Sequence, residues 1–226
     1  MLPAPRVGAR SVGDAVMTED GSWEYNTEPA ADTPEEAARY WASVHPYLFK
    51  KPWVSRVAKT VAEYEPSSVV EFGASAGRNL AAIRKILPAA QLIGLDINHG
   101  AIEAGRERWG LDLRPGGVAA LSGLKADLAF TVSVIDHLPE PSAAISALVD
   151  VAPTVLLIEP WTGEEGILTK RTHAETGETK AVTPFTYSWD YWRLAQELGL
   201  LVNSEPFPIE TDLGPHYRLF RLTKPG

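Results

Sequence analysis

The sequence contains no cysteine among its 226 residues. This absence excludes disulfides, thiolate zinc sites and thiol nucleophiles. Basic residues are in deficit as well, with 21 Lys and Arg against 29 Asp and Glu and a formal net charge of −8. Nucleic acid is therefore an unfavourable partner, because contacts with phosphates need a basic surface.

Long hydrophobic runs are also missing. No window holds 18 uninterrupted apolar residues, so we expect no membrane span and no membrane partner. The first residues, Met-Leu-Pro-Ala-Pro-Arg, lack the apolar stretch of a secretory signal. With 45% hydrophobic and 22% charged residues, the composition is that of an ordinary globular protein. We therefore expect a cytoplasmic enzyme or binding protein.

The most informative segment that is present runs from residue 69 to residue 80. An apolar strand pattern leads through Glu71 into Gly73-x-Ser75-x-Gly77, and a helix-forming run follows. Glycine lets a ligand approach the backbone, and the helix start adds free N–H groups and a positive dipole end. A second strand pattern ends in Asp96, 19 positions after Gly77. A glycine turn followed by a strand-end acid is how an α/β sheet holds a nucleoside.

Other readings of this segment stay open. Gly73 and Gly77 could simply shape a strand-to-helix turn, and Asp96 could cap the next helix, a role for which Asn98 competes. The dinucleotide fingerprint is a weaker match, because serine replaces its second glycine. No GxxxxGK[ST] run occurs, so a P-loop is excluded.

From residue 68 onward, strand and helix patterns alternate. The expected strands cover 68–72, 92–95, 111–113, 128–133, 154–158, 200–206 and 216–222, and the expected helices 78–87, 99–109, 142–149 and 189–198. Such alternation predicts an α/β fold, a three-layer α/β/α sandwich around a mostly parallel seven-stranded sheet. The link between the last two strands is too short for a crossover helix, which predicts an antiparallel C-terminal hairpin.

The expected organisation has two parts. Residues 1–65 form a flexible N-terminus and a helical arm or lid, with helices from Pro34 to about residue 45 and over 52–64. Thr33 and Glu36 suit a capping box at the first of these helices, and Ser188 suits the cap of the helix over 189–198. Residues 66–226 form the ligand-binding domain. Its loop over 160–187 is a possible substrate lid, because loops of that length are usually functional or disordered.

This combination resembles the class I (Rossmann-like) S-adenosylmethionine-dependent methyltransferases. The run 71–77 resembles their first motif, an acid followed by GxGxG, with Ser75 in place of the middle glycine. The segments 95–97, 127–139 and 158–160 resemble the ends of the second, fourth and fifth strands. One departure is the absence of an acid in 115–119, after the third strand, so adenine is expected to be held there by backbone or apolar contacts.

The resemblance implies S-adenosyl-L-methionine as cofactor and S-adenosyl-L-homocysteine as product. Asp96 would bind the two ribose hydroxyls, Ile97 would lie along the adenine unless it is a core residue, and Glu71 would face the methionyl ammonium directly or through water. The implied cofactor-binding residues are Glu71, Gly73, Ala74, Ser75, Gly77, Asn79, Asp96, Ile97, Ser133 and Val134.

His137, just after the fourth strand, is the candidate catalytic residue. Its imidazole could remove a proton from the acceptor, with Asp136 to orient it, or it could be an ordinary loop histidine. Candidate substrate-wall residues are Tyr40, Trp161, His173 and Tyr187, for which core packing is the alternative.

The resemblance implies methyl transfer to an O or N of a small-molecule acceptor. The alternatives are a protein or nucleic-acid methyltransferase, or a non-catalytic binding domain. Methylation of cytosine C5 would need a cysteine, and no [DNS]-P-P-[YFW] segment for base amino groups occurs. No spacing is diagnostic of a metal site, so none is predicted, and nothing in the sequence indicates an oligomeric state.

Overall fold

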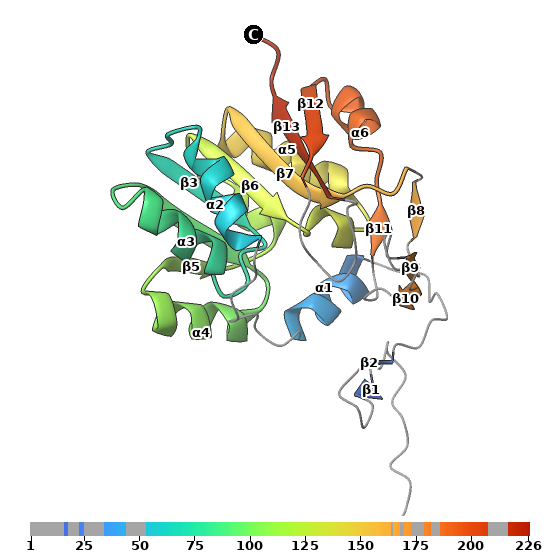
Figure 1. Ribbon diagram of the computed structural model, residues 1–226, viewed down its shortest axis with the longest axis horizontal. Helices are drawn as coiled ribbons and strands as arrows, with labels where there is room; N and C mark the ends of the chain where they lie inside the picture. Colours follow the sequence, from blue (N-terminus) through green and yellow to red (C-terminus); the bar gives the residue numbers. More distant parts are fainter. Residues whose placement is uncertain are drawn as a thin grey trace, which may run out of the picture.

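The fold is organised around a seven-stranded sheet (Figure 1), seen here in a computed structural model. The structure describes residues 16–17, 23–24, 34–43, 53–163, 165–167, 170–172, 179–181, 186–207 and 217–226. The strands of the sheet are β3 (Ser68–Phe72), β4 (Gln91–Asp96), β5 (Asp112–Pro115), β6 (Leu128–Val132), β7 (Thr154–Pro160), β12 (Leu201–Pro206) and β13 (Tyr217–Thr223).

The strand order is β12-β13-β7-β6-β3-β4-β5. Strands β3 to β7 of this sheet are mutually parallel, whereas β13 runs antiparallel to both β7 and β12. The predicted mostly parallel sheet with an antiparallel C-terminal hairpin is thus confirmed. The order reverses between β3 and β6, and ligands of open α/β sheets bind outside the carboxyl ends of the strands at such a point.

Helices cover both faces of the sheet, as the three-layer prediction requires (Figure 1). The helices α2 (Val54–Ala62), α3 (Arg78–Ile86) and α4 (His99–Trp109) share one apolar cluster with the sheet. The helices α5 (Pro141–Val151) and α6 (Tyr191–Glu197), with the short turn η1 (Val118–Leu121), share the cluster on the other face.

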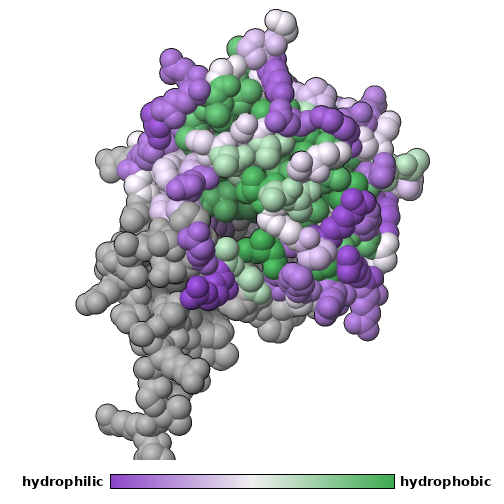
Figure 2. Space-filling view, turned by 180° about the vertical axis from the view of Figure 1, so that it is seen from behind, coloured by the Kyte–Doolittle hydropathy of each residue, from purple (hydrophilic) through white to green (hydrophobic). Residues whose placement is uncertain are grey.

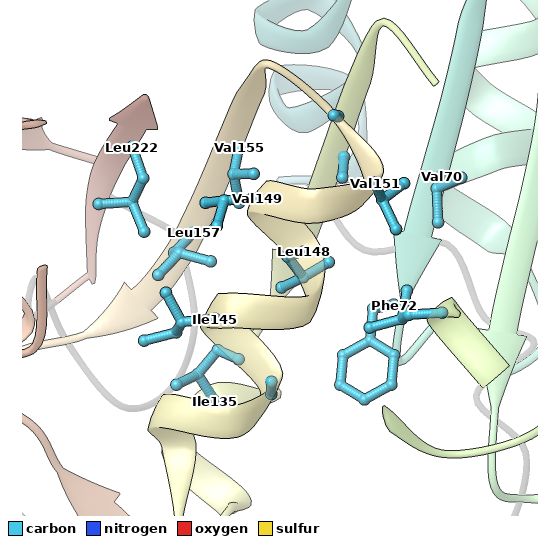
Figure 3. Packing of buried hydrophobic residues seen from close by; sticks show 14 of the residues in the cluster. Val70, Phe72, Ile135, Ile145, Leu148, Val149, Val151, Val155, Leu157 and Leu222 are labelled. Atoms are coloured by element: carbon cyan, nitrogen blue, oxygen red, sulfur yellow. The ribbon is translucent and has the colours of Figure 1, made fainter. Parts of the chain in front are cut away.

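The two clusters exist because the central strands are apolar on both faces. Val69 belongs to the α2–α4 cluster and its neighbour Val70 to the α5–α6 cluster, since successive side chains of a strand point to opposite faces. Figure 3 shows Ile145 and Leu148 of α5 lying against the sheet beside Leu157 of β7. Full burial of each such side chain stabilises the fold by about 1.5–3 kcal/mol, which fastens the helices over the sheet.

Capping residues set the starts of two helices. Asn98 caps α4, where its Oδ1 accepts the Ala101 N–H at 2.9 Å. The predicted cap of the last helix was wrong: Asp190, not Ser188, accepts the N–H groups of Trp192 and Arg193, at 3.1 and 3.0 Å. Ser188 is instead part of a strand, and α6 therefore begins two residues later than expected.

The predicted loop over 160–187 contains four short strands. These are β8 (Gly166–Ile167), β9 (Lys170–Thr172), β10 (Thr179–Ala181) and β11 (Tyr187–Ser188), with β8 paired to β11 and β9 to β10, both antiparallel. The described strands of this segment thus pair with one another as a hairpin. Its role as a substrate lid stays a prediction.

Three elements precede α2 in the described part of the chain. The strands β1 (Val16–Met17) and β2 (Trp23–Glu24) pair antiparallel, and α1 covers Pro34–Ser43. The predicted arm helix at Pro34 is confirmed, whereas the proposed Thr33–Glu36 capping box lies outside the described residues. The second arm helix is shorter than the predicted 52–64.

The surface distribution of side chains is uneven. On the side opposite to that of Figure 1, hydrophobic side chains gather toward the middle and hydrophilic ones surround them (Figure 2). The exposed large hydrophobic residues of the described chain, Ile86, Trp192 and Leu201, come from three different elements, a scatter that is usual for protein surfaces. Among the described helices, none has the length and apolar character needed to cross a bilayer.

Helix α4 allows a direct test of its packing, because it carries two glycines in different surroundings. A Cβ on Gly105 would lie 2.4 Å from the backbone oxygen of Ala76, whereas one on Gly100 would meet nothing closer than 3.6 Å. Gly105→Ala should lower the free energy of unfolding by about 1–3 kcal/mol through overpacking. Gly100→Ala should leave it unchanged or raise it by up to about 1 kcal/mol. Urea denaturation measures both, and equal effects would contradict the described packing.

Candidate active site

The glycine loop after β3 has a backbone that only certain residues adopt easily. Gly73 and Gly77 have φ of 77° and 74°, and Ser75 between them has φ of 48°. A Cβ on Gly73 would lie 2.2 Å from a methyl carbon of Val134, so glycine is required there for space as well as conformation. Ser75 is not a glycine, so the same kind of backbone conformation costs about 1–3 kcal/mol there. Residues with such backbone strain cluster at functional sites.

Asp96, at the end of β4, stabilises this loop through hydrogen bonds to its backbone. Its Oδ2 accepts the Ser75 N–H at 2.6 Å and its Oδ1 accepts the Asn98 N–H at 2.8 Å. Burial raises the pKa of Asp96, and the backbone hydrogen bonds act in the opposite direction. The structure excludes the alternative that Asp96 caps α4, because Asn98 does so. Each carboxylate oxygen retains a second lone pair, so Asp96 can still accept two hydroxyl protons from a ligand.

Glu71, near the end of β3, is buried behind the same loop with 1% of its surface exposed. The Asn79 Nδ2 donates to its Oε1 at 2.6 Å. Two acceptors, Glu71 Oε2 and Asn79 Oδ1, are buried without a hydrogen-bond partner among the described residues. Burial raises the pKa of Glu71 to about 8, although the Asn79 hydrogen bond and the nearby Arg78 oppose the shift. Such orphaned acceptors are costly unless a donor reaches them.

Arg78 directly follows the glycine loop, and its side chain lies over the ring of Trp53. The Arg78 guanidinium carbon lies 4.5 Å from the centroid of the Trp53 ring. A cation over an aromatic face is held by the quadrupole of the ring. The signal for Arg78 was its place directly after the glycine loop. Trp53 is partly buried against the α2–α4 cluster.

A second group of polar side chains lies in the turn after β6, named η2 (Ile135–His137). Ser133, which precedes it, has φ of 52°. Its Oγ donates to Asp136 at 3.3 Å and accepts from the Tyr217 hydroxyl at 3.0 Å. His137 Nε2 lies 3.6 Å from Asp136 Oδ1, and the side-chain exposures are 14% for His137 and 1% for Asp136. The side chains of Ser133 and His137 therefore both lie beside the buried carboxylate of Asp136.

Glu159 of β7 holds this turn in place through hydrogen bonds. Its Oε1 accepts the Thr131 hydroxyl at 2.6 Å, and its two oxygens accept the Val134 N–H at 3.2 and 3.1 Å. Its Oε2 also accepts the Asp136 N–H at 3.4 Å. Burial raises the pKa of Glu159 well above its usual range, and the charge of Asp136 adds to the shift. In the sequence, Glu159 marks the end of the fifth expected strand and, with Asp136 and His137, a group whose spacing is not diagnostic of a metal. Tyr217, whose partner is 84 positions away, carries no local signal.

The remaining predicted residues lie around these two groups. Ile97 is half-buried, with its Cγ2 3.5 Å from where a Cβ of Gly117 would be, so it faces the segment after β5. Trp161 packs edge-on against Trp192, with 5.7 Å between ring centroids. Tyr187 is buried and stacks on Trp189 at 5.3 Å.

Tyr40 lies in α1 but its side chain is outside the described residues, as is His173 entirely. Trp189 Nε1 donates to the Leu138 carbonyl at 3.2 Å, which links the end of the long hairpin to the turn of His137. Over the described ranges, no three His, Asp or Glu side chains are grouped so that they could hold a metal ion.

The parallel sheet explains why these residues meet. Strands β3, β4 and β6 are neighbours that run in one direction, so the loops at their carboxyl ends open at a single edge. The packing of Val134 against Gly73 joins the glycine loop to the turn that carries His137. The arrangement can hold a nucleoside on one side and a proton-accepting side chain on the other.

Comparison with solved structures identifies the fold. CalS10, a SAM-bound amino pentose methyltransferase from Micromonospora echinaspora, has a TM-score of 0.59 at 13% identity, over 88% of this chain and 100% of its own. The mitomycin 7-O-methyltransferase MmcR has 0.58 at 18%, over 76% and 54%. The methyltransferase domain of bacterial CtHen1-CN has 0.57 at 17%, over 75% and 97%.

No protein-family model and no curated protein sequence matches the chain. At these identities the structural likenesses show the fold alone. The fold is that of the class I methyltransferases, which confirms the resemblance deduced from the motifs at the level of architecture.

The raised pKa of Glu71 predicts a pH dependence of stability. A carboxyl whose pKa rises from 4.5 in the unfolded chain to about 8 in the folded one stabilises fully below pH 4.5, and this stabilisation is lost as the pH rises to about 8. The wild-type chain should therefore lose unfolding free energy over that range relative to Glu71→Gln. Urea denaturation at a series of pH values measures the difference. Glu103→Gln, at an exposed position of α4, should parallel the wild type; a Glu71→Gln curve that also parallels it would refute the pKa shift.

Proposed function

We propose that this chain is an S-adenosylmethionine-dependent methyltransferase that acts on an O or N of a small-molecule acceptor. The proposal rests on Glu71 Oε2, which is buried behind the strained glycine loop and has no hydrogen-bond partner among the described residues. Asp96, at the end of the neighbouring strand β4, accepts the Ser75 N–H of the same loop. This pair of acids places an acceptor for an ammonium group and an acceptor for vicinal hydroxyls on either side of one loop. S-adenosylmethionine, a nucleoside joined to an amino acid through sulfur, has both the ammonium group and the vicinal hydroxyls.

The residues present fit this cofactor. Glu71 Oε2 and Asn79 Oδ1 would accept from its ammonium, which supplies the donor that both atoms lack among the described residues. Asp96 would accept from the ribose hydroxyls through its remaining lone pairs, in charge-assisted hydrogen bonds. Ile97 would lie along the adenine, and the backbone of Ala74 and Ser75 would approach the ligand closely. The carboxylate of the cofactor would face the guanidinium of Arg78, the residue that directly follows the glycine loop.

When bound, the cofactor supplies an electrophilic methyl group on a sulfonium sulfur. The chain must then hold the acceptor in line with that methyl group and keep water away. Such positioning supplies up to about 7–11 kcal/mol of rate enhancement in favourable cases. His137 would take the proton of the acceptor, a contribution of about 10²–10⁴-fold. Ser133 and Val134 would border the space between cofactor and acceptor, and Trp161 and Tyr187 would form its far wall.

A small-molecule acceptor is favoured over a macromolecule by two observations. The net charge of −8 disfavours a polyanionic substrate. CalS10 and MmcR, which are named for an amino pentose and for mitomycin, superpose over three quarters or more of this chain. A protein or nucleic-acid methyltransferase and a non-catalytic S-adenosylmethionine-binding domain are the competing functions.

Loss of the Asp96 carboxylate gives a measurable effect on cofactor binding. Asp96→Ala should weaken binding of S-adenosylmethionine by about 1.5–3 kcal/mol, because charged hydrogen bonds are removed. Asp112→Ala is the matched control: it removes an acid from the neighbouring β5 that is ion-paired with Arg114 and half exposed. Isothermal titration calorimetry should show an unchanged affinity for the control. Equal affinities for both variants would remove Asp96 from the cofactor site.

Methyl transfer itself is tested with the wild-type chain. We expect calorimetry to show binding of both S-adenosylmethionine and S-adenosylhomocysteine, and mass spectrometry to find a methylated product when the chain is incubated with pools of small amines, alcohols and phenols. The absence of binding by either compound would refute the proposal. Binding of both without transfer to any pool would favour the non-catalytic domain.

A further inference from the structure

Arg78 stands at a position where its charge is locally unfavourable. It is the first residue of α3, and it directly follows Gly77 of the glycine loop. The N-terminal end of a helix carries a partial positive charge, which repels a cation and favours an anion. The first turn of α3 contains no acidic residue that would offset this repulsion. The presence of a basic side chain at this place is therefore explained by its contacts outside the helix.

The ring of Trp53 supplies one such contact. Trp53 directly precedes α2, and its ring centroid lies 4.5 Å from the guanidinium carbon of Arg78. Both residues are half-buried, and Trp53 also packs against the α2–α4 cluster. An aromatic face attracts a cation through its quadrupole, and more strongly where the pair is partly removed from water. The contact thus holds a long and flexible side chain in one place at the start of α3.

The charge of Arg78 also acts on the buried acid behind the glycine loop. It opposes the rise in the pKa of Glu71, so the guanidinium lies within electrostatic reach of that carboxyl. Glu71 Oε2 and Asn79 Oδ1 are buried acceptors without a hydrogen-bond partner among the described residues. This region therefore offers acceptors for a cationic group together with a cationic donor. The ammonium and carboxylate of an amino acid, both on one carbon, are the complementary pair.

We propose that Trp53 is a positioning residue, whose ring holds the Arg78 guanidinium where it receives the carboxylate of the cofactor's amino-acid group. This inference rests on the proposed function and deepens it, because it names the residue that prepares the site for one part of S-adenosylmethionine. An arginine that stacks on an aromatic ring still presents its N–H groups as a rigid fork, which suits a carboxylate. The ring acts through Arg78 and needs no contact with the ligand.

The anchoring of α2 explains why the ring can serve as a fixed support. Helix α2 packs against α3, and its residues Val57 and Val61 are fully buried in the α2–α4 cluster. An unrestrained arginine loses rotamer freedom when it closes on a ligand, which weakens binding. A guanidinium that the ring already holds loses less. The benefit applies to a ligand with a carboxylate and not to a nucleoside that lacks one.

Two ligands separate this role from general packing. S-adenosylhomocysteine carries the amino-acid group, whereas 5′-methylthioadenosine has the same nucleoside and a thioether sulfur without that group. Calorimetry with the wild-type chain should show tighter binding of S-adenosylhomocysteine. Trp53→Leu should weaken its binding by about 3–30-fold, the range expected for a lost cation–π contact. The same substitution should change the affinity for 5′-methylthioadenosine by less than about twofold, because that ligand has no group for Arg78.

Trp109→Leu is a control in closely similar surroundings. The guanidinium carbon of Arg108 lies 4.8 Å from the centroid of the Trp109 ring, and Trp109 packs against the same α2–α4 cluster. Trp109 is the last residue of α4, whereas Trp53 lies over the first residue of α3. The control should leave the affinities for both ligands unchanged. Urea denaturation shows whether each variant is folded.

A double substitution tests whether the ring acts through the guanidinium. Arg78→Gln should itself weaken binding of S-adenosylhomocysteine more than binding of 5′-methylthioadenosine. The further addition of Trp53→Leu should then cost less than about twofold, because the ring no longer has a charge to hold. Trp53→Phe keeps an aromatic face, so its affinity for S-adenosylhomocysteine should stay within about threefold of the wild type.

Equal weakening of both ligands by Trp53→Leu would overturn the inference and leave Trp53 as a packing residue. Additive effects of the two substitutions would overturn it as well, as would a wild-type chain that binds the two ligands equally. If Trp53→Leu does not fold, Arg78→Gln decides, since an equal effect on both ligands contradicts the assigned role. Failure of the proposed function is a separate result, because neither ligand would then bind to the wild-type chain.

Discussion

The contact between the Asp96 carboxylate and the backbone N–H of Ser75, 2.6 Å long, is the interaction on which the rest of the site depends. It ties the glycine loop after β3 to the end of β4 and holds Ser75 in a backbone region that L-residues rarely adopt. Two further hydrogen bonds, from the N–H groups of Gly73 and Ala74 to the Leu95 carbonyl, close the same junction. Hydrogen bonds within the chain therefore hold the loop in this conformation.

The site has two halves, and the Gly73–Val134 contact joins them. The first half, from β3 and β4, presents acceptors for a cationic group and for hydroxyls. The second half, from β6, β7 and β13, presents an imidazole in front of two buried acids. A side chain on Gly73 would displace Val134 and with it the start of the turn that holds His137. Glycine at 73 would thus serve both the proposed proton transfer and the proposed cofactor binding.

Much of the fold was predictable because it follows from local signals. Alternating strand and helix patterns, a glycine turn and a closing hairpin are each visible in a short window, and the observed sheet follows them. The predicted cap at Ser188 was wrong because a competing strand pair, Ser188 with Gly166, is not visible in either window alone. The hairpin inside 160–187 escaped prediction for the same reason, since strands of two or three residues carry little periodicity.

The site was predictable only in part, and the division is physical. Glu71, Asp96 and the glycines belong to motifs whose spacing is fixed by the turn between strand and helix. Glu159 and Tyr217 act through contacts with residues 25 and 84 positions away, which only the sheet order brings together. The contact between the Asp136 N–H and the Glu159 carboxylate likewise joins residues of two different strand ends, and no local pattern encodes it.

The most direct test of the central claim is a crystal structure of the chain with S-adenosylhomocysteine. We predict the ribose hydroxyls at the Asp96 carboxylate, the ammonium at Glu71 Oε2 and Asn79 Oδ1, and the sulfur facing Ser133 and His137. A ligand that binds elsewhere on the chain, or one that leaves Glu71 Oε2 without a donor, would contradict the account.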